Sequence, residues 1–179
     1  MSLLEMYNNT GSRSDKEHFH KYITGFYGNK FDPLRNDKLD ILEIGLFRGD
    51  SIKLWEDFFI NSNIYCADLN KDYLHHEFSD RVELFLMDAY TQEFLDLLKN
   101  KNLKFDIIID DGPHSFDSQN FTCQNLFQFL KPGGILIVED VVDYNVNKLQ
   151  INNPQFSIVN LLHLAVAWND SIIFYRENL

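Results

Sequence analysis

The chain has 179 residues, of which 45% are hydrophobic and 24% charged, a size and composition typical of one soluble globular domain. Its formal net charge of −11 argues against a broad surface for the phosphates of DNA or RNA, so we expect no nucleic-acid partner. We see no apolar run of membrane-spanning length, no signal peptide and no metal-type spacing of Cys66 and Cys123, and we therefore expect a single cytoplasmic domain over residues 1–179.

The N-terminal segment has a helical pattern over residues 14–27, whose apolar side carries Phe19, Tyr22, Ile23 and Phe26. We expect Ser14 to cap this helix, Glu17 to complete a capping box and Gly28 to end the helix. Residues 1–38 would then be a helical extension that contributes to the site.

A glycine turn follows the first strand. Residues 39–51 read Leu-Asp-Ile-Leu-Glu-Ile-Gly-Leu-Phe-Arg-Gly-Asp-Ser, which predicts a buried strand at about 40–45, a turn, and a helix at about 51–61 capped by Asp50 or Ser51. Gly45 and Gly49 let the backbone approach a ligand. The Gly-x-Gly-x-x-Gly spacing of dinucleotide sites is absent, and the Glu43 carboxylate before the turn favours a cationic ligand over a phosphate.

Strands and helices then alternate along the chain. The pattern predicts strands at 64–68, 82–87, 105–110 and 134–139 and helices at 91–98 and 116–130, the last ended by Lys131-Pro-Gly-Gly134. Such alternation predicts an α/β fold with a Rossmann-like, doubly wound and mostly parallel sheet.

The tail predicts two further strands, at 158–167 and 171–176, paired as an antiparallel hairpin around Trp168-Asn-Asp170. A helix over 155–165 is the alternative, because short apolar runs are ambiguous.

Acidic residues recur where the predicted strands end: Glu43, Asp68, Asp88, Asp110, Asp111, Glu139 and Asp140. Ligands of such sheets bind beyond the carboxyl ends of the strands, and so many carboxylates on one rim must be tied to cations or hydrogen-bond donors. Asp68 stands 23 residues after Gly45, which suits a carboxylate that binds ribose hydroxyls. Asp88-Ala89 is expected near an adenine amino group.

Two segments at neighbouring strand ends could bind a metal. Asp110-Asp111-Gly-Pro-His114 follows one buried strand and Glu139-Asp140 follows another. Three carboxylates from the two could hold one hard cation such as Mg²⁺ beside a substrate oxygen. His114 could take a proton there, since its ordinary pKa of about 6.5 suits a general base. The alternative for His114 is a loop histidine bonded to the backbone.

These segments together resemble known methyltransferases. Glu43-x-Gly-x-x-x-Gly-x-Ser51 is similar to the first motif of class I enzymes that use S-adenosylmethionine. The metal-dependent macrolide-sugar O-methyltransferases of the mycinamicin and macrocin group have segments similar to Ser14-Asp-Lys16 with His20 and Tyr22, Asp110–His114, Lys131–Asp140 and Trp168–Glu177. The chain departs from that group in Ser14 for Thr, in Pro113 for Ser, and in a shorter segment from Val141 to Ser157.

The resemblance implies the class I methyltransferase fold and methylation of a sugar hydroxyl on a small-molecule or glycan acceptor. It implies Asp111, Glu139 and Asp140 as ligands of a divalent metal, Mg²⁺, and His114 and Asp111 as catalytic residues, with His114 the base. The S-adenosylmethionine donor is expected to contact Glu43, Gly45, Leu46, Phe47, Ser51, Asp68, Leu69, Asp88, Ala89 and Asp110. Because this segment is short, we expect an acceptor pocket that is either open or completed by the N-terminal helix or by a second subunit of a homo-oligomer.

Three other interpretations stay open. Catechol and caffeoyl-coenzyme A O-methyltransferases share the first motif but carry Asp-Asn where this chain has Glu139-Asp140. A non-catalytic nucleotide-binding scaffold is suggested by the short segment after Asp140 and by Pro113. Methylation of nucleic-acid bases is disfavoured, because the Asn/Asp-Pro-Pro-aromatic motif is missing and the chain is acidic.

Overall fold

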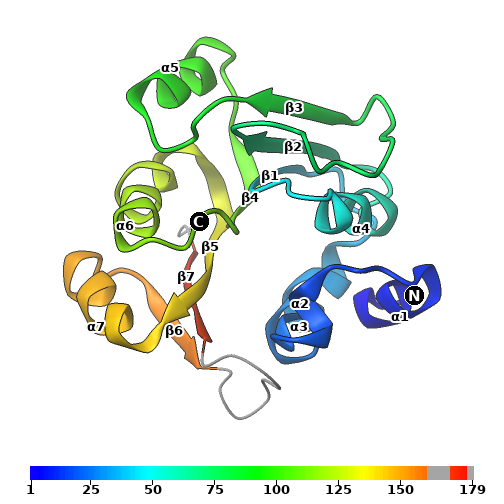
Figure 1. The fold of residues 1–179 in the computed structure, drawn as a ribbon, viewed down its shortest axis with the longest axis horizontal. Coiled ribbons are helices and arrows are strands. Elements are labelled where there is room, and N and C mark those ends of the chain that lie inside the picture. Colours follow the sequence, from blue (N-terminus) through cyan, green and yellow to red (C-terminus); the bar gives the residue numbers. More distant parts are fainter. Residues whose placement is uncertain (161–169, 177–179) are drawn as a thin grey trace.

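A twisted sheet forms the centre of the molecule (Figure 1). The computed structural model describes residues 1–160 and 170–176, which form seven strands in the order β3-β2-β1-β4-β5-β7-β6. The strands are β1 (Asp40–Ile44), β2 (Asn63–Asp68), β3 (Val82–Leu86), β4 (Phe105–Asp110), β5 (Leu130–Val142), β6 (Ser157–Asn160) and β7 (Asp170–Arg176). The first five pair in parallel, and β7 pairs antiparallel with β5 and β6. The predicted Rossmann-like, mostly parallel sheet is confirmed.

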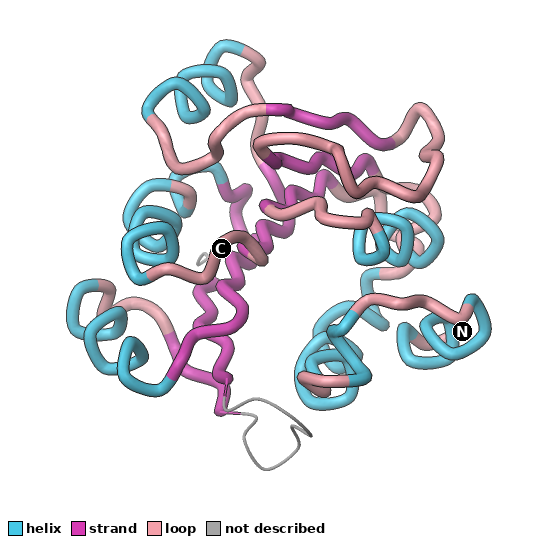
Figure 2. Tube along the Cα trace, viewed as in Figure 1, coloured by secondary structure: helices cyan, strands magenta, loops and turns pink. Residues whose placement is uncertain are grey.

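Helices cover both faces of the sheet, as the buried strands of a parallel sheet require (Figures 1 and 2). One face carries α1 (Leu3–Thr10), α2 (Asp15–His18), α3 (Gly28–Phe31) and α4 (Asp50–Phe58), with a π-helical turn η1 (Ile23–Tyr27) and a 3₁₀ turn η2 (Asp32–Leu34). The other face carries α5 (Gln92–Asn100), α6 (Phe116–Asn125) and α7 (Asp143–Asn152), with a 3₁₀ turn η3 (Phe127–Phe129).

Alternating side chains of β1 divide the core into two clusters. Ile41 packs with Trp55 and Tyr27 on the α4 face, whereas Leu42 packs with Phe94 on the α5 face. Because side chains alternate along a strand, Glu43 shares the face of Ile41. Its carboxylate therefore points toward the N-terminal helices.

The predicted single helix over 14–27 is wrong. The chain leaves α2 after His18, takes a positive φ of 59° at Lys21, and resumes in η1 and α3, so that Gly28 begins a helix instead of ending one. Ser14 does cap α2 through Lys16 N at 3.4 Å. Glu17 completes no capping box, because its carboxylate accepts hydrogen bonds from the backbone and side chain of Thr24. Most of the residues in this range are helical, as predicted, but the turn around Lys21 divides them into separate short helices.

Other boundaries also differ from the prediction. α4 begins at Asp50 with Gly49 as its N-cap, so neither Asp50 nor Ser51 caps it. Lys131-Pro-Gly-Gly134 belongs to β5, and the preceding helix already ends at Asn125. The sequence pattern did not predict α1 or α7.

The antiparallel end of the sheet agrees with the predicted pair of strands. Ser157 pairs with Phe174 and Asn160 with Ser171, so the β6 residues are not helical. The remainder of the predicted sixth strand, 161–167, and most of the turn at 168–170 lie outside the described residues. Within residues 1–160 and 170–176, no helix has the length and apolar character needed to cross a membrane.

Candidate active site

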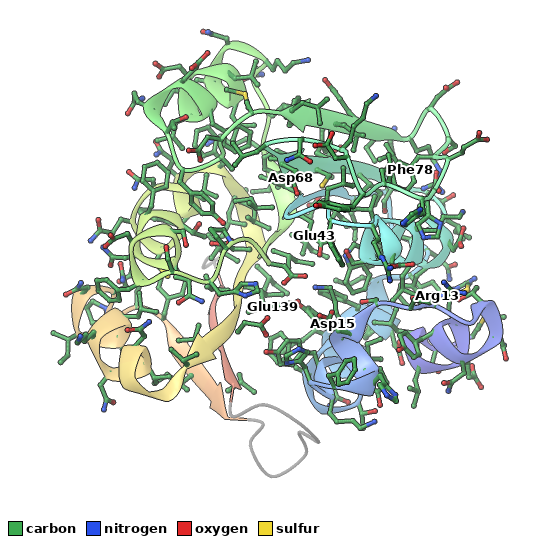
Figure 3. All side chains as sticks on the ribbon, in the orientation of Figure 1. Arg13, Asp15, Glu43, Asp68, Phe78 and Glu139 are labelled. Atoms are coloured by element: carbon green, nitrogen blue, oxygen red, sulfur yellow. The ribbon has the colours of Figure 1, made fainter. Side chains whose placement is uncertain are left out.

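The turn after β1 is built by a close backbone approach at Gly45. Gly45 has a φ of 105°, and a Cβ added there would lie 2.1 Å from the backbone oxygen of Asp111. The amide of Gly45 donates to the Ala67 carbonyl at 2.9 Å, and the Asp68 carboxylate accepts from the amide of Leu46 at 2.7 Å. The turn is therefore fixed against the ends of both β2 and β4. Asp68 is labelled in Figure 3.

Gly45→Ala tests this approach. The left-handed conformation alone costs a non-glycine residue about 1–2 kcal/mol, and the contact with Asp111 adds to that. We expect urea unfolding to show a loss of more than about 2 kcal/mol. Gly11→Ala is the matched control, since Gly11 has a φ of 63° but nothing within 4 Å of its added Cβ. Equal losses in the two variants would contradict the role of the close approach.

One cavity of about 330 Å³, here called the inner cavity, opens beside this turn. Six predicted donor residues line it: Gly45, Phe47, Asp68, Leu69, Asp88 and Ala89. Two others, Leu46 and Ser51, line a neighbouring cavity of about 620 Å³, the outer cavity, which also holds His20 and His114. Asp111 and Gly112 line both, so the two cavities meet at the end of β4.

The last two predicted donor residues, Glu43 and Asp110, lie beneath the cavities and line neither. Trp55 Nε1 donates to Glu43 at 2.6 Å, and the Tyr90 hydroxyl donates to Asp110 at 2.6 Å. Burial raises the pKa of Glu43 to about 7 and that of Asp110 to about 6. Neither carboxyl group therefore faces the interior of these cavities directly.

Lys16 supplies a buried cation to the rim. Its side chain is fully buried, and its ammonium lies 3.2 Å from Glu43 Oε1, 2.7 Å from Asp111 Oδ2 and 2.7 Å from Glu139 Oε2. Burial alone would lower the pKa of Lys16, but the three carboxylates outweigh it and hold the pKa well above its ordinary value. The single positive charge of Lys16, on α2, thus forms ion pairs with carboxylates from β1, from the residue after β4 and from β5. Lys16 belongs to the N-terminal segment that resembles the methyltransferase signature, but the sequence did not predict this role.

Two buried tyrosines complete the N-terminal contribution. The hydroxyl of Tyr22 donates to Asp140 and that of Tyr27 donates to Glu139. Burial raises the pKa of both tyrosines, so both remain donors at neutral pH. His20, also buried, stacks on Tyr22 with ring centroids 4.9 Å apart.

A β-bulge explains how consecutive acids can serve one site. In the pairing of β5 with β7, Val138 lies opposite Ile173 and Val141 opposite Ser171, so β5 carries one extra residue. Asp140 there has a φ of 53°, and Gln119 donates from Nε2 to the carbonyls of both Glu139 and Asp140. A regular strand would send neighbouring side chains to opposite faces, whereas the bulge redirects Asp140 toward the rim.

His114 completes a cluster at the mouth of the outer cavity. Its Nε2 lies 3.3 Å from Asp111 Oδ1 and 3.4 Å from Asp140 Oδ2. Its φ is 55°, a conformation that few non-glycine residues adopt and that is enriched at functional sites. Burial lowers the pKa of His114, but the two aspartates outweigh it and raise the pKa above its ordinary value.

The same cluster has the donor set of a metal site. One ligand atom each from Asp111, His114 and Asp140 lies within 4.8 Å of the others. Two predicted ligands and the predicted base are therefore together. The third predicted ligand, Glu139, is adjacent in sequence but bonded to Lys16 and Tyr27. Carboxylate oxygens fit a hard divalent cation, so Asp111 and Asp140 are suited to hold one.

Comparison with known proteins gives consistent matches. A methyltransferase domain family matches residues 42–141. Mycinamicin VI 2''-O-methyltransferase of Micromonospora griseorubida is 31% identical over 130 residues, covering 69% of this chain and 32% of that protein. An 8-demethyl-8-alpha-L-rhamnosyl tetracenomycin-C 2'-O-methyltransferase of Streptomyces olivaceus is 31% identical over 135 residues, covering 72% of this chain and 35% of that protein. The chain thus spans about a third of the length of these relatives.

A solved structure shares the fold. The MycE methyltransferase of the mycinamycin pathway, solved with Mg, S-adenosylhomocysteine (SAH) and mycinamycin VI, superimposes with a TM-score of 0.73 at 21% identity. The superposition covers 99% of this chain and 55% of that one. The described helices and strands are therefore arranged as in a class I methyltransferase.

Proposed function

Because the chain belongs to the methyltransferase domain family, as its motifs predicted, we propose that it is an O-methyltransferase that uses S-adenosylmethionine. We propose a sugar hydroxyl, on a small molecule or glycan, as the acceptor. The names of the two curated relatives, one of which specifies a rhamnosyl group, support this acceptor class. The Glu139-Asp140 pair, in place of Asp-Asn, disfavours the phenolic alternative.

One observation carries the proposal: the two cavities meet at Asp111, and His114 lines the outer cavity next to that junction. A donor with its adenosine against Asp68 and Asp88 in the inner cavity would place its methionine end at Gly45, next to Asp111. An acceptor in the outer cavity would approach the same point from the side of His114. Methyl transfer is an in-line displacement, so donor and acceptor must enter from two sides.

His114 is the proposed general base. Its imidazole would take the proton of the acceptor hydroxyl as the oxygen bonds to the methyl carbon and the carbon–sulfur bond breaks, leaving a neutral thioether. Asp111 and Asp140 lie within 3.4 Å of the His114 Nε2 and would stabilise the imidazolium that forms. Positioned bases of this kind contribute roughly 10²–10⁴-fold to a rate.

Mg²⁺ is the proposed metal, held by Asp111 and Asp140 with Glu139 as the third carboxylate. When bound, a divalent cation lowers the pKa of a substrate oxygen and orients it. Lys16 would keep Asp111 ionised and hold both Asp111 and Glu139 in place, because its ammonium contacts both at 2.7 Å. Residues 1–38 are thus proposed to work with the rest of the chain as one domain.

Calorimetric titration with SAH, with and without Mg²⁺, tests the proposal. We expect SAH to bind the wild type and the Asp111→Asn variant, and a separate Mg²⁺ signal to be lost in Asp111→Asn and after chelation. Asp117→Asn, an exposed aspartate in the first turn of α6, is the matched control and should keep both signals. SAH binding without a metal signal would overturn the metal-dependent mechanism. Absence of SAH binding would favour the scaffold interpretation.

The remaining expectations stay proposals. The acceptor side is open enough that a second copy of the chain could complete it, so a homo-oligomer is proposed. A cytoplasmic location is supported by Cys66 and Cys123, which are both buried and free.

A further inference from the structure

A third cavity of about 580 Å³ lies beside the outer cavity, between the end of α1 and the start of α4. Basic side chains line it: Arg13, Arg48, Lys53, His75 and His76. Arg13 and Arg48 also line the outer cavity, so the two cavities are continuous. Figure 3 shows Arg13 between α1 and α4, beyond Asp15. We call this space the arginine cavity.

Both acids that line the arginine cavity already have partners. Asp57 forms an ion pair with Lys53 at 2.5 Å, and Asp50 is hydrogen-bonded to His76 at 2.9 Å. Among the residues that the structure describes, Arg13 and Arg48 form no ion pair with a carboxylate. Arg48 instead places its guanidinium 5.7 Å from the ring centroid of the exposed Phe47. Two arginines without acidic partners, in a chain of net charge −11, leave a local positive site.

The wall of the arginine cavity is fixed to the turn after β1. The amide of His75 donates to the carbonyl of Arg48 at 3.1 Å. A Cβ added to Gly49 would lie 2.7 Å from Leu74 and 2.9 Å from Phe78, so the segment between β2 and β3 packs closely on this glycine. The position of Arg48 is therefore set by the same turn that shapes the inner cavity.

We propose that Arg13 and Arg48 bind an anionic group, a phosphate or a carboxylate, carried by the acceptor. This inference rests on the proposed function and names the acceptor class more narrowly, as an anionic sugar or glycan. Neither Asp111 nor His114 lines the arginine cavity. The anionic group would therefore lie in the arginine cavity while the reacting hydroxyl lies in the adjoining outer cavity. Arginine is suited to this task because its planar guanidinium offers paired donors to phosphate and carboxylate.

Titration of the SAH-saturated protein with inorganic pyrophosphate and, separately, with glucuronate tests the inference. Saturation with SAH satisfies the donor's own carboxylate, so that a remaining anion site belongs to the acceptor. We expect at least one probe to bind, and Arg13→Gln and Arg48→Gln each to weaken it by about tenfold or more, as for charge-assisted hydrogen bonds. The tighter probe identifies the group as phosphate or carboxylate. Lys38→Gln/Lys71→Gln, which removes two exposed charges outside the cavity, should change the affinity less than about twofold.

Two results would overturn the inference. One is the absence of binding by both probes, or equal binding by the wild type and the arginine variants. The other is a loss of affinity for SAH, but not for 5'-methylthioadenosine, in the arginine variants, since the site would then serve the donor's carboxylate. In both cases the wild type would still bind SAH. A failure of the proposed function would instead abolish SAH binding in the wild type, so the two kinds of failure can be told apart.

Discussion

Lys16→Met is expected to lower the free energy of unfolding by about 3–5 kcal/mol, because removing one partner of a buried ionic cluster leaves the others uncompensated. Glu43 and Glu139 would remain buried, and Asp111 partly buried, without their cation. Urea unfolding monitored by tryptophan fluorescence would measure the loss. Lys131→Met is the matched control, since Lys131 also bridges two acids, Asp40 and Asp106, but on a partly exposed surface. It should cost less than about 1 kcal/mol.

The pH dependence of the Lys16→Met loss has a defined sign. Without the ammonium, burial and mutual repulsion hold the pKa values of Glu43 and Glu139 still further above their unfolded values. Stability is then kept below the unfolded pKa of about 4.3 for Glu and is lost as pH rises through the folded pKa, which for Glu43 is about 7 even with Lys16 present. The deficit against the wild type should therefore grow from acidic to neutral pH. A constant deficit, or a Lys16→Met loss equal to that of Lys131→Met, would contradict the electrostatic role of Lys16.

His114→Ala is expected to reduce kcat by roughly 10²–10⁴-fold, the usual contribution of a positioned general base. The affinity for SAH should change less than twofold, because His114 does not line the inner cavity. In the wild type the rate should rise with pH as the imidazole of His114 loses its proton and becomes able to accept one from the acceptor hydroxyl. That rising limb should vanish in the variant, and added imidazole should restore part of the rate. The assay requires an acceptor, for which anionic sugars are the first to screen.

His18→Ala is the matched control for His114→Ala. His18 is an exposed histidine of α2 that packs on Phe19 and lines none of the three cavities. We expect its kcat and pH profile to match the wild type. Full activity of His114→Ala would remove the general-base assignment while leaving the fold and the donor site intact.

The sheet could be predicted from the sequence because its signals are local. β4 carries the predicted bounds of Phe105–Asp110, since a strand buried on both faces is a continuous apolar run. The positions of the acidic residues at the carboxyl edge of the sheet could be predicted in the same way, because each stands where an apolar strand segment ends. The prediction that these acids need cations or donors also agrees with the structure.

The identity of those partners could not be predicted. Lys16 lies 95 residues from Asp111 and 123 from Glu139 in the sequence, and Tyr22 lies 118 from Asp140. Periodicity describes one helix or strand at a time and carries no information about such pairs. The same limit explains the error over 14–27, where the helix gives way to the turn and π-helical segment that bring Tyr22 and Tyr27 to the acids.

Glu43 has a cationic partner, as its position before the turn suggested, but the partner is not a ligand. A carboxylate before the turn was expected to favour a positively charged ligand. In the structure its cationic partner is Lys16, at 3.2 Å, and the carboxylate is fully buried. The protein itself therefore provides a cation for Glu43, which the sequence did not reveal.

The bulge in β5 makes this strand sensitive to the insertion or deletion of a single residue. The one extra residue decides which side chains of the strand face each side of the sheet, because a shift by one residue exchanges the two faces. Deleting either Glu139 or Asp140 would restore regular pairing with β7 and leave one acid at the rim. An in-frame loss of one codon here would thus leave an intact sheet with an incomplete rim, whereas a conservative codon change would preserve the geometry.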